Sequence, residues 1–256
     1  MPSIVINADD YGLTDGVCRS IKTLLDLNAI SNTTIMIAAD GAPSRCRLHD
    51  VSSIAGRAGV HLQLTGGRPI SPLRDVPSLV DRTTGLFLPP DQAGNCHPGE
   101  VLVEWRRQIE TVAALLGERP THLDSHHGAH RLPEFTPAYL TLAVEFHLPV
   151  RGGTTIGQLE TATHGVRSSA VSVNTWTGRG LGLAELKTTI LQYLHRVKSD
   201  TPIEIVTHPG FCDATLASIS GLNILRETDH AVLLAFARDP WLEEQHIRLV
   251  RYPSLR

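Results

Sequence analysis

Short apolar runs alternate with helix-like patterns along the whole of this 256-residue chain, and this alternation limits the folds open to it. Residues 3–8 have the pattern of a buried strand that stops at Asp9-Asp10, and residues 15–25 then carry apolar side chains at helical spacing. A strongly β-branched run at 203–207 repeats the strand signal late in the chain. Strands that alternate with helices predict a parallel sheet with helices outside it.

The same patterns divide the rest of the chain. Strands are expected at 3–8, 33–39, 58–64, 121–124, 149–151, 170–173, 203–207 and 247–250. Helices are expected at 15–25, 98–116, 137–146, 183–197 and 225–236. Thr14 or Asp15 is a candidate cap for the first of these helices, and Gly117 suits the end of the second. Residues 65–99, with six prolines, form a long excursion of the kind that is usually functional or disordered.

Seven or eight parallel strands in a chain of this length predict an α/β fold, a distorted, TIM-like (β/α) barrel that takes in residues 1–256 as a single domain. An open doubly wound sheet is the alternative. It is less favoured because the first strand leads into neither a G-x-G-x-x-G nor a G-x-x-x-x-G-K-[ST] phosphate loop.

Charge and composition exclude several classes of partner. Lys and Arg total 23 against 26 Asp and Glu, a net charge of −3, and the basic residues are scattered. Neither nucleic acid nor an anionic membrane surface is therefore an expected partner. No apolar run approaches the roughly 20 residues of a membrane span, and the first residues lack a signal-peptide pattern. The four cysteines are far apart, which is typical of reduced thiols, and we expect a cytoplasmic protein.

Polar side chains gather where the predicted strands end. Because the carboxyl ends of parallel barrel strands form one face, residues far apart in the chain are expected to share one cleft there. The residues concerned are Asp9, Asp10, His61, Asp124, His126, Arg151 and His208.

Two imidazoles and one carboxylate from separate strands can bind a metal ion on one side and leave other coordination positions open. We nominate Asp10, His61 and His126 for this site. A bound ion lowers the pKa of water, and an adjacent carboxylate can take the proton that water loses. His208, fixed between a strand and Pro209, suits protonation of a leaving group. This combination indicates hydrolysis.

Side-chain alternation refines these predictions. Successive strand residues point to opposite faces, so Asp124 and His126 share a side and His127 points away unless the turn has already broken the pleat. Asp124 either binds the metal or orients a histidine ligand. Asp9 and Asp10 cannot both point inward on a regular strand, so one of them is expected where the strand gives way to a turn.

Four segments of the chain resemble the YdjC-like carbohydrate deacetylases, which include chitooligosaccharide deacetylases. They occur in the family's order and span most of the chain. The segments are Asn7-Ala8-Asp9-Asp10-Tyr11-Gly12-Leu13-Thr14, Gly59-Val60-His61-Leu62-Gln63-Leu64-Thr65, Pro120-Thr121-His122-Leu123-Asp124-Ser125-His126-His127 and Thr207-His208-Pro209.

The resemblance implies a barrel-like fold and a divalent ion, Mg²⁺ first and Zn²⁺ in some relatives. It implies hydrolysis of the N-acetyl group of an amino sugar, with a homodimer as the family's expected assembly. Asp9 matches the family's catalytic base, and Arg151 matches an arginine near that carboxylate. Asp10, His61 and His126 match its metal ligands, and His208 its candidate acid. Many relatives have a third consecutive histidine where this chain has Gly128, which puts substrate specificity in question.

Three further residues are candidates for sugar contacts. Tyr11 and Thr65 belong to the first two motifs, and Trp176 is a loop aromatic that could stack on a sugar face. The resulting hypothesis is a metal-dependent carbohydrate N-deacetylase. A metal-dependent phosphoesterase and a catalytically silent sugar-binding relative are the alternatives.

Overall fold

A curled parallel sheet forms the centre of the computed structural model, which describes residues 1–153, 165–197 and 200–252. The strand order is β4-β3-β2-β1-β6-β5, with β7 also paired to β1, and every pairing between these strands is parallel. The strands are β1 (Ser3–Tyr11), β2 (Asn32–Ile35), β3 (Ala58–Leu62), β4 (Leu123–Ser125), β5 (Ser172–Val173), β6 (Ile203–Thr207) and β7 (Arg248–Leu249). This arrangement confirms the predicted distorted (β/α) barrel.

Single-residue bridges bring the two edges of the curled sheet together. Val150 pairs in parallel with Leu123 of β4 and with Ser168, which lies just before β5. Arg151 continues this contact, because its backbone N–H donates to the Leu123 carbonyl at 2.9 Å. The strand predicted at 149–151 is therefore reduced to one bridged residue, since only Val150 pairs on both sides.

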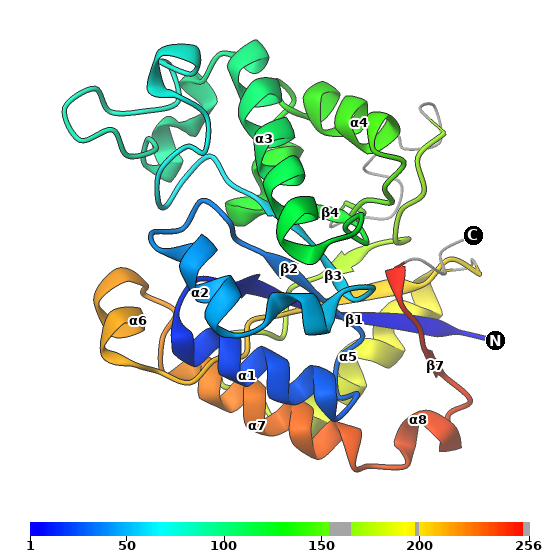
Figure 1. Cartoon of the computed structure of the whole chain (residues 1–256). Helices are drawn as coiled ribbons and strands as arrows, with labels where there is room; N and C mark the ends of the chain where they lie inside the picture. Colours follow the sequence, from blue (N-terminus) through cyan, green and yellow to red (C-terminus); the bar gives the residue numbers. More distant parts are fainter. Residues whose placement is uncertain (154–164, 198–199, 253–256) are drawn as a thin grey trace.

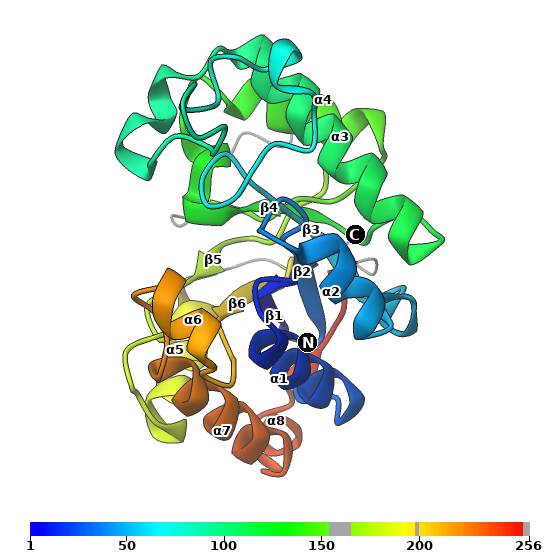
Figure 2. The same ribbon diagram turned by 60° about the vertical axis from the view of Figure 1, so that its left-hand side comes forward.

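Helices pack around the outside of the curled sheet. In Figures 1 and 2, α3 and α4 lie on one side of the strands and α1, α5 and α7 on the other. The helices are α1 (Asp15–Asp26), α2 (Ala42–Leu48), α3 (Pro98–Leu116), α4 (Thr136–Glu145), α5 (Leu183–Arg196), α6 (Ala214–Ile219), α7 (Leu225–Ala237) and α8 (Trp241–Glu244). Every residue of β1 is buried, because one face of the strand packs on α1 and the other, with Asn7 and Asp9, faces the inside of the curled sheet.

The local signals in the sequence set the ends of the helices. Thr14 caps α1, its hydroxyl accepting a hydrogen bond from the Val17 N–H at 3.3 Å. Gly117 ends α3 with φ +73°, a left-handed conformation that suits glycine. None of the helices in the described ranges is both long and apolar enough to cross a membrane.

The proline-rich excursion after β3 is attached to α3 by buried carboxylates. Glu104 accepts hydrogen bonds from the backbone N–H groups of Ile70 and Ser71, both at 2.9 Å, and is fully buried. Glu100 accepts from the Ser78 N–H at 2.7 Å. These bonds order a segment with only short 3₁₀ helices of its own.

Candidate active site

A cavity of about 520 Å³ opens at the carboxyl ends of the strands, where the sequence predicts the chemistry. The side chains that line it come from β1, β3, β6, the segments after β4 and β6, and the start of α7. They include Asp9, Asp10, His61, His126, Arg151 and His208, all of which were predicted, and Arg131, Asn174 and Arg226, which were not.

An irregularity at the end of β1 lets two adjacent aspartates face the same cavity. Asp10 has φ +73°, and the pairing of β1 with β2 shifts register between Ala8 and Tyr11. Positive φ is uncommon outside glycine, although aspartate is among the residues that adopt it most readily. The expected break in the strand therefore falls at Asp10, within the residues assigned to β1.

The three predicted metal ligands converge. Oδ1 of Asp10 lies 3.3 Å from Nε2 of His61 and 3.6 Å from Nδ1 of His126. One ligand atom from each residue falls within 4.8 Å of the others. Oδ1 of Asp10 is buried and has no hydrogen-bond partner among the described residues, so the 3.3 Å contact lacks hydrogen-bonding geometry. An orphaned carboxylate oxygen between two imidazoles fits a bound cation.

Asp124 hydrogen-bonds to His61 and lies outside this group of three, although Asp9, His61 and Asp124 form a second group that could hold an ion. Nδ1 of His61 donates to Oδ1 of Asp124 at 2.7 Å, which turns Nε2 toward Asp10. Burial alone would lower the pKa of His61, but the carboxylates of Asp124 and Asp9 raise it to about 10. A metal ion would therefore displace a proton from Nε2 on binding.

Arg226 of α7 holds the Asp10 carboxylate on its other side. Nη2 of Arg226 donates to Oδ2 of Asp10 at 2.6 Å, and its Nε donates to the Leu222 carbonyl at 2.8 Å. Burial would raise the pKa of Asp10, but Arg226 and the two imidazoles hold it well below its usual range. Asp10 is thus ionised and directs its free oxygen at the histidines.

Asp9 is held by Arg151 through two hydrogen bonds. Nη1 and Nη2 of Arg151 donate to the Asp9 carboxylate at 2.8 and 2.6 Å. Arg151 is fixed in turn by Glu204, which accepts from its Nε at 3.0 Å and from the Tyr252 hydroxyl at 2.5 Å. Burial would raise the pKa of Asp9, but the Arg151 guanidinium lowers it below its normal value, so Asp9 is ionised.

The charges of this buried cluster also fit a divalent cation. Four carboxylates and two guanidinium groups meet within hydrogen-bonding reach, so with all four carboxylates ionised the cluster carries two negative charges once His61 has lost its proton to a bound ion. Uncompensated buried charge is costly, and two positive charges at the Asp10 group would neutralise it. The acidic members are Asp9, Asp10, Asp124 and Glu204, and the basic members are Arg151 and Arg226.

His208 lines the same cavity and lies beside Asp9. Its Nε2 is 3.8 Å from Oδ2 of Asp9, and its Nδ1 is 3.1 Å from the hydroxyl of Thr177. Burial lowers the pKa of His208 despite the nearby carboxylates, so its resting imidazole is neutral at pH 7. The side chain remains 23% exposed, which leaves one edge open to the cavity.

His127 does not point away from the site. Its φ of +52° breaks the strand pleat, and its ring packs beside that of His126 with centroids 3.8 Å apart. Nδ1 of His127 lies 2.9 Å from the Thr65 hydroxyl. Thr65 is buried outside the cavity lining, so its contact with the site is through His127.

The other two expected sugar contacts lie in the core. Tyr11 is fully buried, with its hydroxyl 3.4 Å from the His49 carbonyl. Trp176 is 1% exposed and donates from Nε1 to the Gly182 carbonyl at 3.2 Å. Neither side chain lines the cavity, and we correct both assignments: these rings fill core space.

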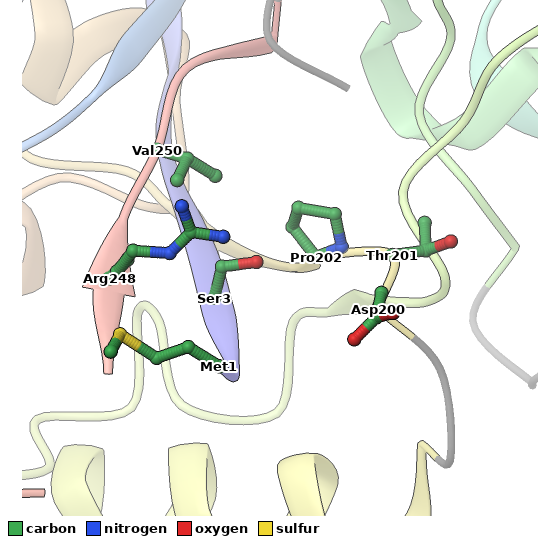
Figure 3. A pocket seen from close by; sticks show the side chains of 7 residues that line it. All are labelled: Met1, Ser3, Asp200, Thr201, Pro202, Arg248 and Val250. Carbon is green, nitrogen blue, oxygen red and sulfur yellow. The ribbon is translucent and has the colours of Figure 1, made fainter. Parts of the chain in front are cut away.

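A larger hollow, of about 840 Å³, lies at the opposite end of the sheet (Figure 3). It is bounded by the starts of β1, β6 and β7, including Ser3, Pro202 and Arg248. The carboxylates and imidazoles described above do not line it, and active sites of parallel barrels lie at the other face. The smaller cavity is therefore the candidate active site.

Comparison with known proteins agrees with this geometry. The model of the YdjC-like protein family matches residues 3–245. The chain belongs to the YdjC-like family. A carbohydrate deacetylase of Brevibacillus brevis is 30% identical over 255 residues, covering 98% of this chain and 99% of that protein. A chitooligosaccharide deacetylase of Yersinia pestis is 31% identical over 252 residues, covering 96% of this chain and 96% of that protein.

Solved structures extend the similarity to the fold. A protein from Enterococcus faecalis, provisionally named for cellobiose-phosphate cleavage, superimposes with a TM-score of 0.80 at 29% identity, covering 99% of this chain and 98% of the other. The lactam utilization protein of Thermus thermophilus matches with a TM-score of 0.50 at 16% identity, covering 98% of this chain and 100% of the other. The second likeness concerns the fold alone.

Proposed function

We propose that this YdjC-like protein is a metal-dependent carbohydrate deacetylase. The substrate would be an N-acetylated amino sugar of the chitooligosaccharide type, cleaved to acetate and a free amine. The observation that carries the proposal is an ionised Asp9 beside the Asp10–His61–His126 group in one cavity. The names of two relatives aligned over nearly their full length support the substrate class.

Asp10, His61 and His126 would hold the ion. When bound, a divalent ion supplies Lewis acidity and lowers the pKa of water. Imidazole nitrogen suits zinc and other transition metals, whereas magnesium is usually held by oxygen ligands and water. The donor set therefore favours Zn²⁺ over the Mg²⁺ that the family resemblance implies.

The remaining residues divide the proton transfers. As the water oxygen attacks the amide carbon, Asp9 accepts the proton that the water loses. Arg151 holds Asp9 in place through two hydrogen bonds and keeps it ionised for that step. His208, which lies beside Asp9, delivers a proton to the amide nitrogen as the carbon–nitrogen bond breaks.

The two alternatives account less well for the same residues. A phosphoesterase needs cationic groups free to bind phosphate, but two of the three arginines that line the cavity in the described part of the chain, Arg151 and Arg226, are already paired with buried carboxylates, which leaves Arg131 alone for that role. A silent sugar-binding protein has no need of a second ionised aspartate beside the metal ligands.

Acetate release from N,N′-diacetylchitobiose tests the proposal. The zinc-loaded protein is expected to release acetate, a chelator is expected to stop it, and added zinc is expected to restore it. Asp9→Asn should lose activity but keep the metal. No release from this sugar or from a panel of N-acetylated sugars would contradict the proposal, and phosphate release from sugar phosphates would favour the phosphoesterase.

A further inference from the structure

A chain of hydrogen bonds leads from His208 away from the cavity to a buried aspartate on α7. Asp229 is 1% exposed, and its carboxylate accepts from the Gly178 N–H at 3.1 Å and from the His208 N–H at 3.3 Å. The Thr177 hydroxyl makes a short hydrogen bond to Oδ2 of the same carboxylate. The Thr177 oxygen is also 3.1 Å from Nδ1 of His208.

The order of donors in this chain fixes where the protons are. The Asp229 carboxylate accepts from two backbone N–H groups, and as an acceptor it also takes the single proton of the Thr177 hydroxyl. The Thr177 oxygen then offers only lone pairs to His208, and Nδ1 of the imidazole has to carry the proton between them. In a neutral imidazole this leaves Nε2 without a proton, and Nε2 is the atom 3.8 Å from Asp9.

We propose that Asp229 and Thr177 are positioning residues that lock His208 as its Nδ1–H tautomer and present a bare Nε2 to the cavity. The tautomer defines the path of the proton through His208, and the catalytic role of that path rests on the proposed function. Asp9 hands the proton that it takes from the attacking water to Nε2 of His208, 3.8 Å from its Oδ2, and the same proton moves to the amine nitrogen as the carbon–nitrogen bond breaks. His208 ends each turnover neutral, as it began.

The arrangement also stabilises the imidazolium that exists between these two transfers. With Nδ1–H already donating toward Thr177, the positive ring faces the buried Asp229 carboxylate through one hydroxyl. The backbone N–H of His208 donates to the same carboxylate, so the ring and its main chain are held by one group. A ring fixed in this way cannot turn to exchange its two nitrogens without breaking these hydrogen bonds.

Nitrogen NMR of the full-length chain labelled with ¹⁵N-histidine, with metal removed, tests the tautomer without any assay of activity. The His208 signals are assigned by their loss in His208→Gln. We expect protonated Nδ1 and bare Nε2 in the wild type, and the same in Thr177→Ser. Asp229→Ala removes the acceptor, so the Thr177 hydroxyl becomes free to donate to Nδ1 and signal from a ring protonated at Nε2 should appear. A wild-type proton on Nε2, or an unchanged proton position in folded Asp229→Ala, would overturn the proposal.

A second measurement separates positioning from simple damage to the fold. Thr177→Val should lower kcat on an N-acetylated sugar about 100-fold and change hydrolysis of 4-nitrophenyl acetate by less than about threefold, since that leaving group needs no proton. Thr177→Ser should restore the amide reaction. Thr188→Val, an exposed threonine on α5, is the matched control and should behave as wild type. Equal slowing of both substrates in a folded Thr177→Val protein would overturn the positioning role. If the wild type cleaves no acetamide, the proposed function fails while the tautomer experiment still decides this inference.

Discussion

Replacing Asp124 by asparagine should weaken metal binding without removing a ligand. Oδ1 of Asp124 accepts from Nδ1 of His61 at 2.7 Å, and this bond directs Nε2 to the Asp10 group. An amide oxygen can still accept from Nδ1, but it carries no charge to raise the basicity of the ring. Loss of such a partner usually costs 10- to 100-fold in metal affinity, which is about 1.4 to 2.7 kcal/mol.

The assay is a competition for zinc at pH 7.5 between the metal-stripped protein and a chromophoric chelator. Asp239→Asn is the matched control, because Asp239 pairs with Lys187 at 2.6 Å outside the cavity. It should bind zinc as the wild type does. Zinc affinity of folded Asp124→Asn within about twofold of wild type would refute the orienting role, since the expected loss is tenfold or more.

Three other substitutions test the surroundings of the site. Arg151→Met should destabilise the metal-free protein by about 3–5 kcal/mol at pH 7, because it leaves buried carboxylates unpaired. Without Arg151 the pKa of Asp9, which is low in the wild type, would rise above its value in the unfolded chain. The loss in free energy of unfolding, measured with urea, should therefore shrink as pH falls from neutral toward 4. An equal loss at both pH values would contradict this. Trp176→Ala should lower the free energy of unfolding by about 3–5 kcal/mol and leave KM for the sugar unchanged. A raised KM would show that Trp176 contacts the sugar after all. Gly16→Ala would place Cβ 2.0 Å from the Phe211 carbonyl oxygen, so the loop after His208 has to shift. The free energy of unfolding, measured by thermal unfolding, should fall by about 1–3 kcal/mol. Unchanged stability would show that the loop moves without cost.

The sequence was sufficient for the elements that depend on local signals. Thr14, Gly117 and the β-branched run at β6 mark their elements at the predicted places, because caps and buried strands are determined by nearby residues. The convergence of Asp10, His61 and His126 was also predictable, because all three follow or lie in parallel strands whose carboxyl ends share one edge.

Contacts made by helices and by irregular backbone were not predictable in the same way. Arg226 and Asp229 lie on α7, more than 200 residues from Asp10, and no spacing in the sequence indicates that this helix begins beside the cavity. The rule of alternating faces failed at His127, because a left-handed residue ends the pleat. Trp176 has the sequence context of a loop, yet its ring packs into the core, a result that depends on tertiary packing alone.

An anomalous diffraction map from zinc-soaked crystals would show whether Asp10, His61 and His126 bind one ion. We expect one strong peak at the carboxyl ends of the strands, within about 2.0–2.2 Å of Asp10 Oδ1, His61 Nε2 and His126 Nδ1. A peak bonded to other residues, or no peak at these three after loading at neutral pH, would contradict this expectation.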